Sequence, residues 1–207
     1  RATVPLPTGT ISALRWRPAT HEIGMTFASV QVAGDVYSFD VTTSSLTRWT
    51  TSDPGFDGRP LPAPEIVHWT SFDGRLISGI LYKAASRFTG PRPVIINIHG
   101  GPVDREYVRF QGRSNYFLNA LGVSIIFPNV RGSDGFGKAF AALDDGVLRE
   151  GAVKDVGALL GWLAIRPDLD RYRVMLTGAS YGGYLSLAVA EAFPDRVRCV
   201  FAAAAIS

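Results

Sequence analysis

The sequence is short of the features that mark several large classes of protein. It has 1 cysteine, Cys199, so the chain cannot form an internal disulfide. No apolar run reaches the roughly 18 residues of a membrane-spanning helix, so we expect no membrane partner. Basic residues outnumber acidic ones only slightly, 21 against 18, without a long basic run, so we expect no nucleic-acid partner either.

The start of the chain and its single cysteine give two further expectations. The chain begins at Arg1 without a methionine or a signal-like segment, and we expect it to be part of a longer protein. Cys199 lies in an apolar, strand-like run, so we expect a buried and unreactive side chain. What is present is an ordinary globular composition, 46% hydrophobic and 19% charged, which is sufficient for one core and a smaller unit.

Residues 1–52 have the pattern of a small antiparallel sheet. Turns separate four short β-like runs, at residues 11–16, 23–32, 36–41 and 46–50. Four strands in about 40 residues are the size of one β-propeller blade, and an independent β-meander is the alternative. A lone blade cannot bury its faces, so its sister blades would lie outside this chain. Residues 53–64, with several prolines and glycines, predict a linker.

Residues 65–207 alternate strands and helices. A hairpin is expected over residues 65–82, and uninterrupted apolar strands at residues 93–98 and 123–127 are typical of a parallel sheet. Apolar residues spaced for one helix face follow between Val153 and Leu163. Further strands are expected at residues 173–176 and 197–205. This alternation predicts a doubly wound, mostly parallel sheet.

The most specific motif is Gly178-x-Ser180-x-Gly182, between the strand at 173–176 and a helix expected over residues 184–192. It is the pattern of a nucleophile elbow, a tight turn that lifts the serine hydroxyl clear of the sheet. The first amides of the helix then point at whatever the serine attacks. An idle serine in a glycine turn is the alternative. Dinucleotide binding is disfavoured because Ser180 stands in place of the fingerprint's second glycine, and we expect neither a cofactor nor a metal.

The second motif is His99-Gly100-Gly101-Pro102, directly after the strand at 93–98. Such a loop supplies a backbone N–H donor for the oxyanion of a tetrahedral intermediate. We predict the N–H of Gly101 as that donor, with Gly100 next, beside the N–H of Tyr181. A plain glycine turn is the alternative reading, and His99 is expected to shape the loop by hydrogen bonding.

The sequence contains no histidine after Ser180. The order in this topology is serine, acid, histidine, so His99 is not the expected base. Glu191 and Asp195 follow the serine but are poorly placed as the acid of a triad. A serine needs a base to become a good nucleophile, so we expect the acid and the base to lie outside this chain.

Together these motifs resemble the prolyl oligopeptidase family of serine peptidases, above all its acylaminoacyl-peptidase branch. The resemblance covers about residues 65–207 and rests on these segments: residues 73–74, 78–82, 99–102, 129–133, 135–137, 155 and 178–184. It implies an incomplete α/β-hydrolase domain preceded by part of a β-propeller. By the resemblance, Ser180 is the nucleophile, Tyr181 and Gly101 are oxyanion donors, and Arg131 and Asp155 are structural.

The resemblance also implies the reaction and the partners. The expected activity is hydrolysis of short peptides through an acyl-enzyme on Ser180. The expected partners are a short peptide substrate and the remainder of the same protein, namely the propeller and a C-terminal segment with the triad acid and histidine. A carboxylesterase or lipase on the same fold, or a non-catalytic fragment, is the alternative. Pro102 in the glycine loop and the blade-like segment favour the peptidase.

Overall fold

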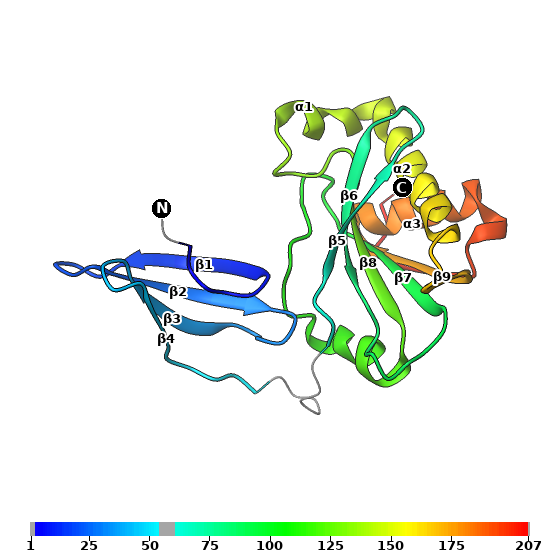
Figure 1. Cartoon of the computed structure of the whole chain (residues 1–207). Coiled ribbons are helices and arrows are strands. Elements are labelled where there is room, and N and C mark those ends of the chain that lie inside the picture. The colour runs from blue at the N-terminus through cyan, green and yellow to red at the C-terminus, as the bar shows by residue number, and fades with distance from the viewer. Residues whose placement is uncertain (1–2, 54–60, 207) are drawn as a thin grey trace.

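The structure is a computed structural model that describes residues 3–53 and 61–206. These residues form two sheets, one with four strands and one with six (Figure 1). Residues 54–60, which make up much of the predicted linker, lie outside the described residues. The predicted division into residues 1–52, 53–64 and 65–207 therefore stays a prediction.

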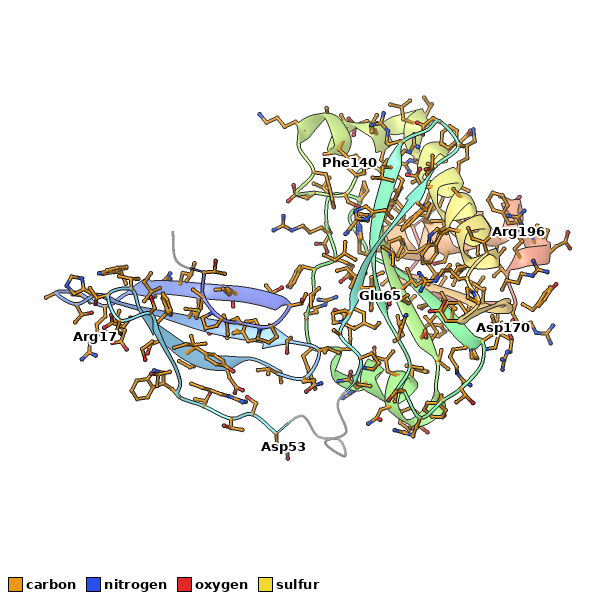
Figure 2. The ribbon with its side chains drawn as sticks, viewed as in Figure 1. Arg17, Asp53, Glu65, Phe140, Asp170 and Arg196 are labelled. Carbon is orange, nitrogen blue, oxygen red and sulfur yellow. The ribbon has the colours of Figure 1, made fainter. Side chains whose placement is uncertain are left out.

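The first sheet is an antiparallel meander with the strand order β1-β2-β3-β4. The predicted strands are confirmed with changes at their ends, as β1 (Gly9–Trp16), β2 (Glu22–Ser29), β3 (Asp35–Asp40) and β4 (Ser45–Arg48). Alternation along β2 and β3 turns Met25, Phe27, Tyr37 and Phe39 into one small core. Strand β1 is mostly exposed within the described residues, as expected of a blade without neighbours. Arg17 lies at the tip of this sheet that points away from the second one (Figure 2).

The second sheet has the strand order β10-β9-β7-β8-β6-β5. Strands β7, β8, β9 and β10 are parallel, whereas β6 is antiparallel to both of its neighbours, β8 and β5. The mostly parallel sheet predicted from the sequence is thereby confirmed. Its strands are β5 (Glu65–Thr70), β6 (Leu76–Tyr82), β7 (Arg92–Ile98), β8 (Ser124–Asn129), β9 (Leu169–Ala179) and β10 (Cys199–Ala203).

Helices α2 (Glu150–Ala164) and α3 (Tyr181–Ala192) pack side by side against the sheet (Figure 1). Their apolar side chains form the main core with the strands beneath them. A second core contains Leu118 from the short helix η2 (Phe117–Leu121), which follows the turn η1 (Gly112–Ser114). Cover on both faces explains why β8 consists of buried residues alone, and why its sequence does not alternate.

Between β8 and α2 the chain forms a helical segment that the sequence analysis did not predict. It consists of α1 (Lys138–Ala141), η3 (Ala142–Asp144) and η4 (Gly146–Arg149). The segment lies at one end of the six-stranded sheet, where Figure 2 shows Phe140, away from Asp170 near the start of β9. Each piece is a single turn, too short for a periodic apolar pattern to reveal it. The structure also adds the short turn η5 (Pro194–Arg196) after α3.

Two predictions about individual segments need correction. Strand β9 begins at Leu169, four residues before the predicted start at Arg173. Leu169 is buried and pairs with Arg92 of β7, but the exposed residues 171–173 that follow it interrupt the apolar run on which the prediction rested. The expectation of a buried Cys199 is wrong, since its side chain is exposed. Strand β10 lies at the edge of the sheet, and alternation turns Cys199 and Phe201 outward while Val200 packs on the core.

Candidate active site

Ser180 occupies the turn between β9 and α3, with φ 56° and ψ −123°. A positive φ is strained for a residue with a Cβ, and such strain concentrates at functional positions. Backbone hydrogen bonds hold the turn on both sides. The Ser180 N–H donates to Ala203 O at 3.0 Å, and the Tyr184 N–H donates to Ser180 O at 3.1 Å. The side chain of Ser180 is exposed, as a nucleophile requires.

The two glycines of the elbow lie so close to the backbone at the end of β7 that neither position has room for a side chain. A Cβ at Gly178 would lie 2.7 Å from the carbonyl oxygen of Ile98, and one at Gly182 would overlap that same oxygen and lie 2.7 Å from His99 O. Both contacts are with main-chain atoms, which cannot rotate away. The elbow therefore packs directly on the point where β7 leaves the sheet and the histidine-glycine-glycine loop begins.

This packing brings the two sequence motifs together. A Cβ at Gly100 would lie 3.7 Å from the Cβ of Ser180 and 3.3 Å from Ala179 O, so the backbone of Gly100 lies against the elbow. Gly101 has φ 120°, and a side chain there would come within 2.5 Å of the Val103 nitrogen. Glycine is thus required at residue 101 by its own backbone. The assignment of its N–H as an oxyanion donor remains a prediction.

His99 is buried at 6% exposure, and both ring nitrogens are engaged within the loops. Nδ1 lies 2.7 Å from Gly100 O and therefore carries the proton, since a carbonyl only accepts. Nε2 lies 2.9 Å from the Ser133 hydroxyl oxygen, and the single proton of that hydroxyl is shared between Nε2 and the carbonyl oxygen of Val130 at 2.7 Å. Burial lowers the pKa of His99, which favours this neutral form. A histidine held in this way has no free nitrogen for the Ser180 proton.

Tyr181 is the first residue of α3, so its N–H is among the amides that have no acceptor within the helix. Its ring is buried in the main core, 5.8 Å from the ring of Tyr184. Its hydroxyl donates to Asp144 Oδ1 at 2.7 Å. The sequence analysis did not identify Asp144 or Ser133 as residues of the site. No local pattern marks Asp144, because its partner lies 37 residues further along the chain.

Neither a base nor a metal ligand set accompanies the elbow in the part of the chain that the structure describes. No side chain among residues 3–53 and 61–206 hydrogen-bonds to the Ser180 hydroxyl. Within the same residues no cluster of His, Cys, Asp and Glu could hold a metal ion. A cavity of about 510 Å³ lies elsewhere, beside Lys83, Arg92 and Asp168. None of the helices in the described ranges is long and apolar enough to cross a membrane.

Ser180 lies on a strained strand-to-helix turn. The sheet beneath it is mostly parallel, and only β6 runs antiparallel to its two neighbours, β5 and β8. These two features define an α/β-hydrolase. Residues 108–207 match the profile of the prolyl oligopeptidase family. This part of the chain, residues 108–207, therefore belongs to the family. The four-stranded sheet is an antiparallel meander of the size and order of one β-propeller blade.

Individual relatives and solved structures agree with this assignment. The chain is 27% identical over 79% of its length to dipeptidyl aminopeptidase BIII of Pseudoxanthomonas mexicana, and 34% identical over 72% to dipeptidyl peptidase 8 of Homo sapiens. A solved structure of prolyl endopeptidases matches 98% of the chain with a TM-score of 0.86 at 24% identity. A puromycin hydrolase matches 95% with a TM-score of 0.81 at 27% identity. The chain spans only 24% and 18% of those two relatives, and 30% of each solved chain.

Proposed function

We propose that the protein is a serine peptidase that hydrolyses short peptides, with Ser180 as its nucleophile. The observation that carries the proposal is the exposed Ser180 at φ 56°, packed against the backbone of Gly100. The names of relatives, which include dipeptidyl peptidases and acylamino-acid-releasing enzymes, support a peptide substrate.

In the proposed reaction the Ser180 oxygen attacks the carbonyl carbon of the scissile peptide bond. The proton of the hydroxyl passes to a histidine, which later gives it to the leaving amine. The carbonyl oxygen becomes negative and accepts hydrogen bonds from the N–H groups of Tyr181 and Gly101. One such donor is worth about 3–4 kcal/mol of the barrier. Water then attacks the ester on Ser180 and releases the acyl product.

We propose that the histidine and its acid come from the remainder of the same protein. All three histidines of the sequence, His21, His68 and His99, precede Ser180, and His99 uses both ring nitrogens. The part of the protein outside the 207 residues would also supply the other propeller blades, which restrict the substrate to short peptides in this family.

Labelling with a fluorophosphonate tests the nucleophile. The complete protein should label at Ser180, the Ser180→Ala variant should not, and the Ser86→Ala variant, at an exposed serine, should label like the wild type. Absence of labelling in the wild type would leave the protein without a catalytic serine. The isolated 207-residue chain should label slowly, because the proposed base is missing, and fast labelling of it would show that a base is present.

Two substrates separate the peptidase from an esterase. The complete protein should release the aniline from an acyl-peptide anilide. Turnover of a short-chain ester alone, without cleavage of the peptide, would assign the site to a carboxylesterase instead.

A further inference from the structure

Asp144 is a buried acid close to the elbow, with an exposure of 2%. It ends η3, and its Oδ1 accepts a hydrogen bond from the Tyr181 hydroxyl at 2.7 Å. Its Oδ2 has no hydrogen-bond partner among the residues that the structure describes. Oδ2 is therefore an exception, because most buried side-chain polar atoms have at least one hydrogen-bond partner.

This arrangement is costly for folding. Within the described ranges no Lys or Arg forms a salt bridge with Asp144, in contrast to the buried Asp155, which pairs with Arg131. Burial raises the pKa of Asp144, which is the sign of an unfavourable place for a carboxylate. An apolar residue at this position would avoid the cost, so stability alone does not explain the acid.

The contacts of Asp144 connect the parts of the proposed site. Tyr181 follows the nucleophile directly and contributes a proposed oxyanion donor. A Cβ at Gly132 would come within 2.5 Å of the Asp144 Cβ and 3.5 Å of the Pro102 Cβ. Asp144 thus lies where the elbow, the loop at residues 131–137 and the loop at residues 99–102 meet.

We propose that Asp144 is a positioning residue, which holds the phenol of Tyr181 and thereby fixes the direction of the Tyr181 N–H in the oxyanion hole. The ring of Tyr181 is 1% exposed and anchored in the core at one end. The hydrogen bond to Asp144 fixes its other end, so the first turn of α3 cannot rotate about its axis. The inference rests on the proposed function, because it assigns a role within that same site.

The substitution Asp144→Ala tests the proposal in the complete protein. It should lower kcat and the rate of fluorophosphonate labelling about 10- to 100-fold, less than the 10²–10³-fold loss of a deleted oxyanion donor. KM should change less than about threefold, because the N–H binds the transition state more strongly than the substrate. The variant Asp144→Asn keeps an acceptor oxygen and should retain activity within about threefold of the wild type.

Substitution of the tyrosine, alone and together with Asp144, and a control at the neighbouring acid complete the experiment. Tyr181→Phe should reproduce the loss of Asp144→Ala, and the double variant should be no slower than either single one, since both remove the same hydrogen bond. Asp145→Ala, at the exposed neighbouring acid, should leave labelling unchanged.

A purely structural role predicts a different pattern. Asp144→Ala would then lower Tm while the folded enzyme labelled at the wild-type rate, and that result would overturn the proposal. Additive losses in the double variant would overturn it as well. Failure of the wild type to label at Ser180 would instead remove the proposed function, so the two failures are distinguishable.

Discussion

The guanidinium of Arg131 forms a two-point ion pair with the buried carboxylate of Asp155. Arg131 Nη2 lies 2.7 Å from Asp155 Oδ1, and Nε lies 2.9 Å from Oδ2. The carboxylate also accepts hydrogen bonds from the Arg131 N–H and the Ser71 hydroxyl. Arg131 extends further to Asp73 at 3.1 Å. One ion pair therefore connects helix α2, the loop after β8 and the β5–β6 hairpin.

Removing one partner of this pair should destabilise the fold. We expect Asp155→Asn to lower the stability by about 3–5 kcal/mol, because it leaves the Arg131 charge buried without its full counter-charge. The measurement is the Tm of the complete protein, recorded with a signal that reports unfolding of the hydrolase domain. Asp145→Asn, at an exposed acid that precedes η4, is the control and should shift Tm little. Equal Tm values for both variants would contradict the structural role of the pair.

The strands and the elbow could be predicted from the sequence, because each depends on local pattern. The meeting of the elbow with the histidine-glycine-glycine loop could be predicted only through the fold that these patterns indicate, in which both segments follow neighbouring parallel strands. Gly178 and Gly182 flank the serine at a fixed spacing, and apolar runs mark β7 and β8. The contact between Tyr181 and Asp144 could not be predicted, because it depends on how single-turn helices fold back over the elbow. The exposure of Cys199 could not be predicted either, because an apolar run does not show which face of an edge strand is covered.

Gly182 should tolerate no side chain, whereas Gly161, which is also a helical glycine, should accept one. In Gly182→Ala the new Cβ would overlap Ile98 O, so we expect a lower Tm and loss of fluorophosphonate labelling. In Gly161→Ala, in the last turn of α2, the new Cβ meets open space, and stability should rise by about 0.5–1 kcal/mol. Normal labelling of Gly182→Ala would show that the elbow does not pack as described.

His99 should make stability depend on pH in the weakly acidic range. Its pKa is lower in the folded protein than the roughly 6.5 of an unfolded chain, because burial disfavours the imidazolium. The unfolded state therefore binds more protons below about pH 6.5, and stability falls as the pH drops from there toward the folded pKa, by up to about 1.4 kcal/mol per pH unit. Above that range its contribution is complete.

The variant His99→Gln should lose this part of the pH dependence. Tm measured between about pH 5 and 8 should fall less steeply on acidification than in the wild type. His68→Gln, at an exposed histidine of β5, is the matched control and should keep the wild-type slope. An unchanged slope in His99→Gln would mean that His99 is charged in the folded protein.

Asp168 should stabilise the protein at neutral pH and lose its effect in acid. Arg166 and Lys83 hold its pKa below the usual range, through contacts of Asp168 Oδ2 at 2.8 Å with Arg166 Nη2 and at 3.1 Å with Lys83 Nζ. The unfolded chain binds the proton at about pH 3.9, so the stabilisation is present above that pH and is lost as the pH falls toward the folded pKa. The side chain is 36% exposed, and solvent limits the effect to about 1 kcal/mol or less. Asp168→Asn should therefore lower Tm at pH 7, and its difference from the wild type should shrink steadily as the pH falls from about 3.9 toward the folded pKa. Asp195→Asn, at an exposed acid, should change Tm little across the same range. A Tm difference that does not shrink on acidification would show that packing, and not charge, accounts for the effect.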